Sequence, residues 1–175
     1  WSVPALVVIF LGGVAWFGSH ELDPAKPLKG ADPVRVEVVS LDWKWLFLYP
    51  DQGVASVNRL VIPAGRPVNF RLTSASVMNS FFVPRLGGQI YTMAGMETKL
   101  HLQADAPGRY RGLSANYSGK GFPGMAFAVE AVAPGQFEAW AAGAKGGGAV
   151  LDAKGYLALA KASENVAPYT YRAVA

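Results

Sequence analysis

The feature that most constrains the fold is a period-two alternation of apolar and polar side chains between Val34 and Val132. Such alternation over about four to eight residues is typical of a strand with one buried face. Turn-forming segments rich in Pro, Gly and Asp separate the strands. Many short strands at this spacing predict a mainly β domain, a β-sandwich or small barrel with Greek-key links. The predicted strands lie within 34–38, 42–49, 68–73, 99–103 and 125–131, with turns at 50–53, 63–65, 87–88 and 107–108.

The first residues, Trp1–Ser19, carry no charged side chain and are mostly apolar. They help to raise the hydrophobic share of the chain to 51%, which is high for a soluble protein. A helix of this length spans about 28 Å, close to the hydrocarbon thickness of a bilayer. Trp1 and Trp16 lie near its two ends, where aromatic side chains favour the membrane interface. We therefore predict a transmembrane helix over residues 1–20; the alternatives are a signal-peptide core and a buried helix.

The segments that flank the β domain differ from it in composition. Residues 21–33 are polar and punctuated by proline, which predicts a linker. Helical spacing of apolar residues predicts a helix over 134–145, with Pro134 acceptable in its first turn. Asp152 is a candidate N-cap for a second helix that reaches about Ala162. We expect the apolar face of this second helix to comprise Tyr156, Leu157 and Ala160.

The last segment, Ala167–Tyr171, is aromatic and contains a proline, and we predict an irregular conformation for it. Such a tail packs either on its own domain or on a partner, and the sequence leaves both alternatives open. Residues 134–175 are therefore interpreted as a short helical, aromatic-ended C-terminal extension.

Residues able to carry catalysis or to bind a metal are scarce. The chain has no cysteine and two histidines, His20 and His101. We interpret His20, at the exit of the predicted helix, as an interfacial polar residue. His101 lies on the polar side of its strand, where we expect a solvated or hydrogen-bonded side chain. Because no Ser-His-acid arrangement, paired-histidine motif or phosphate-binding loop occurs, we predict no catalytic and no cofactor-binding residue on this chain.

One loop carries a specific resemblance to a known family. Residues 112–125 read Gly-Leu-Ser-Ala-Asn-Tyr-Ser-Gly-Lys-Gly-Phe-Pro-Gly-Met. This resembles the copper loop of cytochrome c oxidase subunit II, Gly-x-Cys-x-Glu-x-Cys-Gly-x-x-His-x-x-Met, in its length, its two glycines and its final methionine, Met125. By this resemblance Ser114 and Ser118 replace the two thiolates. Asn116 replaces the glutamate whose backbone carbonyl is a ligand, and Asn79 and Phe122 replace the two histidines.

These replacements argue against a bound metal. A dinuclear copper centre needs soft thiolate bridges and imidazole ligands, whereas a serine hydroxyl is a hard, neutral oxygen. Among the ligand positions only Met125 is retained. A lone thioether is a weak ligand, and a methionine in a β domain more often fills the core. The resemblance and the ligand chemistry together predict a cupredoxin-like domain without copper.

Longer segments resemble one branch of that family, subunit II of the bacterial cytochrome bo type ubiquinol oxidase. This resemblance implies a cupredoxin-like Greek-key β-sandwich over residues 34–133, located in the periplasm. It also implies that helix 1–20 is the second membrane span of the family, in the bacterial inner membrane, and we expect the first span to precede Trp1. The similar segments are residues 20–28, 38–45, 76–87 and 89–96, together with the aromatic-rich extension.

The same resemblance implies a function. The family branch forms haem–copper oxidase complexes that take electrons from ubiquinol, reduce oxygen to water and move protons across the membrane. In these complexes the haems and the remaining copper belong to subunit I, and subunits III and IV are smaller partners. This chain is then expected to be a non-redox subunit II that supports subunit I. A quinol arrives from the lipid phase, so copper ligands outside the membrane can be lost without loss of turnover.

The charge of the β domain bears on its partners. Between Val34 and Val132 there are ten Lys or Arg and six Asp or Glu residues. A basic domain is a poor receptor for cytochrome c, which is itself basic. Because these charges are scattered along a membrane-tethered chain, we also predict no nucleic-acid partner. Trp43 and Trp45 match the aromatic region through which the copper-bearing branch accepts electrons, and we interpret them here as core or interface aromatics.

Two alternative functions stay open at this point. The chain can be a copper-bearing electron-entry subunit of a cytochrome c oxidase, or a membrane-anchored binding module with a cupredoxin shell. Copper content distinguishes the first alternative, and co-purification with a large haem-bearing subunit distinguishes the second.

Overall fold

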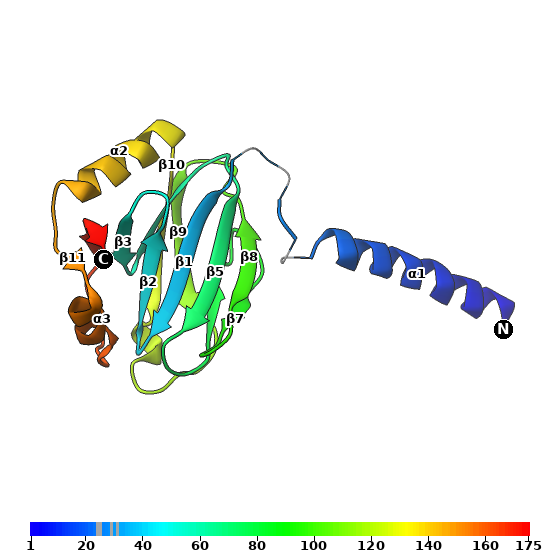
Figure 1. Cartoon of the computed structure of the whole chain (residues 1–175). Coiled ribbons are helices and arrows are strands. Elements are labelled where there is room, and N and C mark those ends of the chain that lie inside the picture. The colour runs from blue at the N-terminus through cyan, green and yellow to red at the C-terminus, as the bar shows by residue number, and fades with distance from the viewer. Residues whose placement is uncertain (24–25, 29, 31) are drawn as a thin grey trace.

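The computed structural model describes residues 1–23, 26–28, 30 and 32–175. A long helix, α1 (Ser2–Glu21), extends away from a β-sandwich (Figure 1). None of its side chains is buried in protein. Within the described residues, α1 is the one helix that is long and apolar enough to cross a membrane. Together with the β domain that follows, this apolar helix indicates a membrane-anchored protein. The predicted linker, 21–33, lies partly outside the described residues.

Two sheets form the sandwich. The strand order is β12-β3-β2-β1-β5-β8 in the larger sheet and β4-β10-β9-β6-β7 in the smaller one. The pairs β1–β5 and β4–β10 are parallel, and the other pairs of these two sheets are antiparallel. The chain changes sheet repeatedly, as a Greek key requires. The strands of the β domain are β1 (Val34–Leu41), β2 (Lys44–Tyr49), β3 (Val54–Val57), β4 (Arg59–Pro63), β5 (Val68–Ser74), β6 (Asn79–Phe82), β7 (Ile90–Thr92), β8 (Thr98–Leu102), β9 (Gly108–Ser114) and β10 (Ala126–Val132).

The core between the two sheets is aromatic. The rings of Phe81 and Phe127 are nearly parallel, with centroids 5.2 Å apart, and Trp45 lies 5.5 Å from each of them. Burial of one such side chain contributes about 1.5–3 kcal/mol to stability. Gly112 leaves room for the Phe127 ring, which a Cβ at this position would overlap. The core therefore extends up to the first residue of the loop that carries the resemblance.

Some strands have no period-two pattern because both of their faces are covered. β3 and β4 are buried along almost their whole length. Outer residues of β3, Ala55 and Val57, pack with Leu159 and Tyr171 of the C-terminal extension in a second apolar cluster. A strand buried on both faces reads as a continuous apolar run. Alternation therefore predicted β1, β2, β5, β8 and β10 and missed these two, and it did not identify β6, β7 and β9 either.

The two predicted helices of the extension are present. α2 spans Pro134–Lys145, and α3 (Ala153–Ala160) begins after Asp152, whose carboxylate accepts a hydrogen bond from the backbone N–H of Gly155 at 2.6 Å. The predicted apolar face of α3 is wrong in one residue, because Leu157 is 67% exposed and Leu159 is buried instead. Residues three and four positions apart share a helix face, so Leu159 and Ala160 lie beside Tyr156 and Leu157 turns away.

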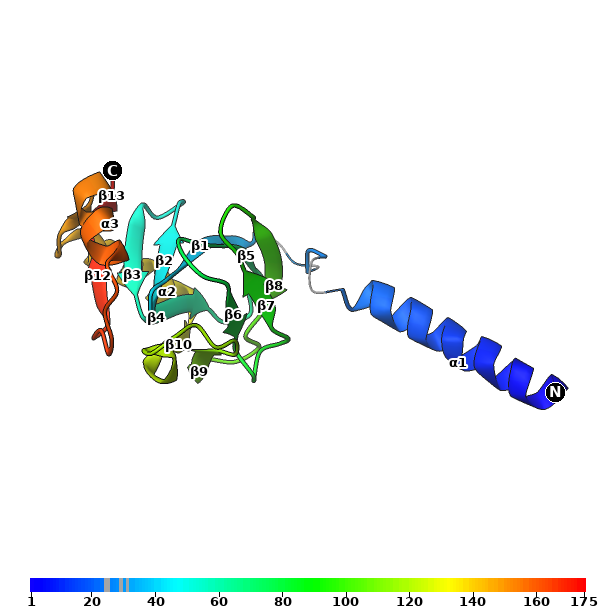
Figure 2. The ribbon, with the colours of Figure 1, turned by 90° about the horizontal axis from the view of Figure 1, so that it is seen from below.

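The tail is more regular than predicted. Residues Tyr169–Tyr171 form β12, which pairs antiparallel with β3, and Ala173–Val174 form β13, which pairs with β11 (Val150–Leu151). The expectation of an irregular end is therefore wrong, because the open edge of β3 supplies hydrogen-bond partners for the tail. Figure 2 shows α3, β12 and β13 together beside β3, on the side of the sandwich away from α1. The tail packs on its own domain.

Candidate functional site

The loop that resembles the copper loop connects β9 to β10. Its two ends meet, because the backbone N–H of Ser114 donates to the carbonyl of Met125 at 3.1 Å. A short 3-10 turn, η1 (Phe122–Gly124), leads into Met125. A second backbone bond, from the N–H of Ala115 to the carbonyl of Ser80 at 3.0 Å, attaches the loop to β6. The loop is thus a closed structure held by backbone hydrogen bonds.

Four of the six ligand-position residues lie close together. Asn79 and Ser114 are buried, and the Ser114 hydroxyl donates to the side-chain oxygen of Asn79 at 3.2 Å. The amide nitrogen of Asn79 donates to the carbonyl of Val77 at 3.2 Å. The Ser118 hydroxyl lies 3.8 Å from the sulfur of Met125, which is buried. Amide and hydroxyl hydrogen bonds therefore join the side chains at positions that the sequence resemblance assigns to metal ligands.

The other two positions hold the loop from outside. The carbonyl of Asn116 accepts a hydrogen bond from the Ser114 hydroxyl at 3.3 Å, and its side-chain amide donates to the carbonyl of Met78 at 3.2 Å. The half-buried ring of Phe122 packs edge-on against Tyr117, with centroids 5.7 Å apart. Both residues stabilise the folded form of the loop.

Trp43 and Trp45 have different environments. Trp45 lies fully buried in the core. Trp43 lies in the turn between β1 and β2, with φ at +66°, and its indole N–H donates to the carbonyl of Ser118 at 3.0 Å. The Trp43 ring packs on Gly119 and Gly121, and a Cβ at Gly121 would overlap it. Trp43 thus holds the loop, and Trp45 fills the core beneath it.

The side chains of the loop do not fit a dinuclear copper centre. The sequence has no cysteine, and both histidines lie elsewhere. His20 ends α1 with its Nδ1 2.8 Å from the carbonyl of Trp16, and His101 lies on β8. In the described part of the chain, no group of three His, Cys, Asp or Glu side chains is placed to hold a metal ion. The loop offers neutral oxygens and one thioether, which copper in such a centre does not prefer.

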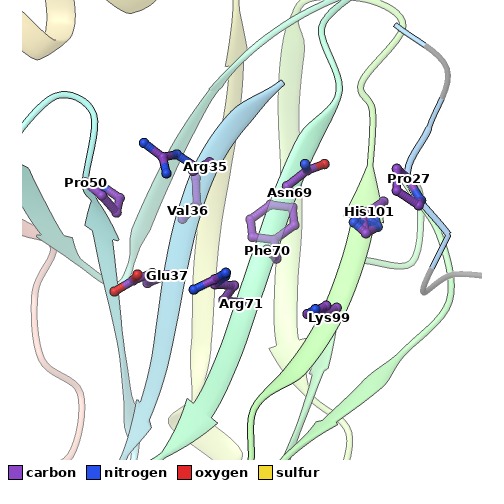
Figure 3. Close-up of a pocket in the computed structure, with 10 residues that line it drawn as sticks. All are labelled: Pro27, Arg35, Val36, Glu37, Pro50, Asn69, Phe70, Arg71, Lys99 and His101. Atoms are coloured by element: carbon purple, nitrogen blue, oxygen red, sulfur yellow. The ribbon is translucent and has the colours of Figure 1, made fainter. Parts of the chain in front are cut away.

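His101 lies in a hollow on the outer face of the larger sheet, next to Asn69 and Pro27 (Figure 3). Its Nδ1 is buried and has no hydrogen-bond partner among the described residues. The expectation of a solvated or hydrogen-bonded side chain is therefore wrong for this atom, because β8 and its surroundings cover it. Burial lowers the pKa of the imidazole, and the charge of Lys99 lowers it further.

Lys44 is a buried polar residue that the sequence analysis missed. Its ammonium donates to the carbonyl of Lys161 and to the hydroxyl of Ser163, both at 2.7 Å. Burial lowers the pKa of this ammonium, and the charge of Asp42 opposes the shift. The signal in the sequence was a lysine at the start of an otherwise apolar strand, Lys44–Tyr49. This side chain ties the C-terminal extension to the sandwich.

Three charged residues that are distant in the sequence meet on the smaller sheet. Arg59 and Arg109 lie far apart in the sequence, yet both bind the carboxylate of Glu130, at 2.6 and 2.8 Å. Burial alone raises the pKa of the Glu130 carboxyl, but hydrogen bonds from the two arginines outweigh burial, and the net pKa lies below its ordinary value. Strand pairing gathers these three charges, which are scattered in the sequence, because it brings β4, β10 and β9 side by side.

The Greek-key sandwich and its closed loop define a cupredoxin-like domain without the sulfur and imidazole donors of a dinuclear copper centre. Residues 12–132 match the family described as cytochrome c oxidase subunit II, periplasmic domain, and the chain therefore belongs to this family.

Solved structures share the fold. The chain is similar to the periplasmic domain of subunit II of cytochrome oxidase from Bradyrhizobium japonicum, with a TM-score of 0.64 and 23% identity, covering 69% of this chain and 98% of that one. It is also similar to a chain of a heme-copper terminal oxidase dimer, with a TM-score of 0.56 and 14% identity, covering 75% and 95% of the two chains. At these identities the likeness shows the fold alone, and it confirms the predicted cupredoxin-like sandwich.

Curated relatives are closer in sequence. The chain is 55% identical over 166 residues to cytochrome bo(3) ubiquinol oxidase subunit 2 of Pseudomonas putida, covering 94% of this chain and 53% of that protein. It is 52% identical over 172 residues to ubiquinol oxidase subunit 2 of Acetobacter aceti, covering 97% and 56%. The chain spans about half the length of these relatives. The predicted resemblance to the ubiquinol oxidase branch is confirmed.

Proposed function

We propose that this chain is the non-redox subunit II of a proton-pumping ubiquinol:oxygen oxidoreductase in an aerobic bacterial respiratory chain. One observation carries the proposal. The copper loop keeps its form with Ser114, Ser118, Asn116, Asn79 and Phe122 at the ligand positions, in a chain more than half identical to two ubiquinol oxidase subunits. In this role the domain supports a catalytic partner and does not relay electrons.

The chemistry of the electron donor agrees with this role. Ubiquinol is apolar and reaches its oxidase from the lipid phase, so the complex needs no metal centre outside the membrane. We propose that residues 1–20 span the bacterial inner membrane and that the linker 21–33 leads to the domain 34–133 in the periplasm. The extension, 134–175, covers the outer side of β3 through the second apolar cluster. It thereby stabilises the domain that the partner contacts.

The proposed partners follow from the complex. The haems and the remaining copper reside on subunit I, and subunits III and IV complete the assembly. This chain has no residue set that would hold either group, since it lacks cysteine and its two histidines lie on α1 and β8. A basic sandwich repels a basic electron carrier, so cytochrome c is not a proposed partner. A membrane tether likewise makes nucleic acid an unsuitable partner.

Purification of the tagged chain from its native membrane in mild detergent tests the proposal. We expect co-elution with a large haem-bearing subunit and oxygen uptake driven by ubiquinol but not by reduced cytochrome c. Membranes from cells with the untagged chain serve as the control. A lone, haem-free chain would favour the binding module. Two copper atoms per copy of this chain, with oxygen uptake from cytochrome c, would favour the electron-entry subunit.

A further inference from the structure

Two strands of the smaller sheet, β4 and β9, present arginines on one outer face, on either side of β10. The cross-strand register places Arg59 of β4 and Arg111 of β9 on either side of Ala128 of β10. Neighbouring strands lie about 4.8 Å apart, so the Cα atoms of the two arginines are separated by roughly 9.6 Å. Only the methyl group of Ala128 lies between them on this face. The result is a strip of surface, which we call the lane, with the small side chain of Ala128 at its base and a guanidinium group on each side.

Glu130 shows how this face binds a carboxylate. Its carboxylate receives Arg59 at 2.6 Å and Arg109 at 2.8 Å. Arg111 is two residues beyond Arg109 on β9, on the same face, and it is exposed. Within the described residues Arg111 has no ion pair. The face therefore offers three guanidinium groups and one carboxylate, which pairs with two of them.

A hollow of about 470 Å³ lies beside Arg109 and Arg111, over Ala126 and Ala128; Arg59 does not line it. Its floor is formed by β10, one side by β9, and the other side by the residue before β4 together with the C-terminal extension. The extension is fixed there because the amide of Asn58 donates to the carbonyl of Val166 at 2.8 Å. The lining residues that define the hollow are Ala126, Ala128, Arg109, Arg111, Val166 and Pro168.

The outer face of the larger sheet is the natural comparison, and Figure 3 shows Arg35, Glu37, Arg71 and Lys99 on it. Its basic side chains have acidic neighbours: Arg35 bonds Asp51, and Arg71 lies 3.7 Å from Glu97. Lys99 and Glu37 complete a face with equal numbers of acidic and basic groups. The β4–β10–β9 face, with Arg59, Arg109 and Arg111 against Glu130, therefore carries more positive than negative charge, unlike the outer face of the larger sheet.

We infer that the β4–β10–β9 face is a docking site for an acidic, extended segment of a partner protein. Guanidinium groups bind carboxylates in a planar, bidentate manner, which suits a segment with repeated Asp or Glu side chains. The distance of roughly 9.6 Å between β4 and β9, the strands on either side of β10, leaves room for one extended chain. A bilayer surface is broad and flat, so it would meet the arginine tips and leave the alanine floor empty. The shape favours a protein segment over a lipid surface.

A polyglutamate peptide with a fluorescent label is a direct probe of this face. We would titrate it with the full chain in an uncharged detergent at low salt and follow fluorescence anisotropy, with polyglutamine as the neutral control peptide. We expect Arg111→Gln to weaken binding about fivefold, the upper range for one exposed ion pair. Lys99→Gln is the matched control, because it removes one positive charge from the other outer face and should leave the affinity unchanged.

A second variant tests the lane independently of charge. Ala128→Leu fills the floor between Arg59 and Arg111 and leaves the net charge unchanged, so we expect it to weaken peptide binding at least as much as Arg111→Gln. An unchanged thermal unfolding midpoint shows that each variant is folded. Equal losses from Arg111→Gln and Lys99→Gln would overturn the inference, because net charge alone would then explain binding. Absence of peptide binding would also overturn it, as would Arg111-dependent binding to phosphatidylglycerol vesicles in place of the peptide.

Discussion

Two consecutive residues, Trp43 and Lys44, hold two different regions of this molecule. Trp43 packs its ring on the glycines of the loop 112–125 and donates to a loop carbonyl. Lys44 binds Lys161 and Ser163 of the C-terminal extension through its buried ammonium. The loop is held by steric fit and backbone hydrogen bonds, whereas the extension is held by strand pairing and apolar contacts together with one buried charge. The comparison teaches that the loop's form does not depend on metal-donor side chains, so the form can persist after the donors are lost.

The largest effect is expected for Gly121→Ala. The new Cβ would overlap the Trp43 ring, so either the ring or the loop must move, and we expect a loss of about 2 kcal/mol in the free energy of unfolding. Thermal or denaturant unfolding of the full chain in detergent measures it. Gly88→Ala is the control, because no heavy atom lies within 4 Å of the position that its new methyl carbon would take. Equal stability of the two variants would show that Trp43 does not hold the loop.

Lys44→Met is expected to loosen the segment of the extension around Ser163 while leaving the loop in place. The substitution leaves the Lys161 carbonyl and the Ser163 hydroxyl without their donor, which costs about 1.5 kcal/mol. Limited proteolysis should cut the segment around Ser163 faster in this variant. Lys154→Met, on the exposed side of α3, should behave as the unaltered chain. If Lys44→Met resists proteolysis as well as the control, strand pairing and the apolar cluster hold this segment without the ammonium.

A smaller effect is expected within the loop itself. Ser114→Ala removes the hydrogen bonds to Asn79 and to the carbonyl of Asn116 at a buried position, so we expect a loss of about 1 kcal/mol. Ser118→Ala removes a long contact to the Met125 sulfur, and its cost should be smaller. Unfolding midpoints of the two variants compare them. A larger cost at Ser118 would contradict the hydrogen-bond network described for the loop.

The smallest effect concerns pH. Burial lowers the folded-state pKa of Lys44 below its ordinary value of 10.5, so between these two pKa values the unfolded chain binds more protons than the folded chain. The free energy of unfolding therefore rises with pH across this window. Because Lys44→Met has no titrating group at this position, its deficit relative to the unaltered chain should widen as pH rises. A series of thermal unfolding curves measures the deficit, and a deficit that narrows with pH would contradict the shift.

The sequence predicted features that are encoded locally. Period two identified β1 and β10, helical spacing and Asp152 identified α2 and α3, and the spacing of residues 112–125 identified the loop. These patterns depend on neighbours in the chain, so they can be read without the fold.

Features that depend on remote partners were not predictable in the same way. β3 lost its alternation because the extension covers it. Leu159 is buried in place of Leu157 because α3 packs against β3, and this contact decides which side of α3 faces the domain. The gathering of Arg59 and Arg109 on Glu130 requires the strand order of the smaller sheet. Pairing between distant segments decides each of these features.

The central claim is that the loop 112–125 keeps its form without copper. The most direct test is the copper bound per chain, measured by elemental analysis of the detergent-solubilised full chain after incubation with excess copper and gel filtration. We expect no more copper in the unaltered chain than in Met125→Leu, which removes the one retained ligand-type side chain. Two copper atoms per unaltered chain, absent from Met125→Leu, would contradict the claim.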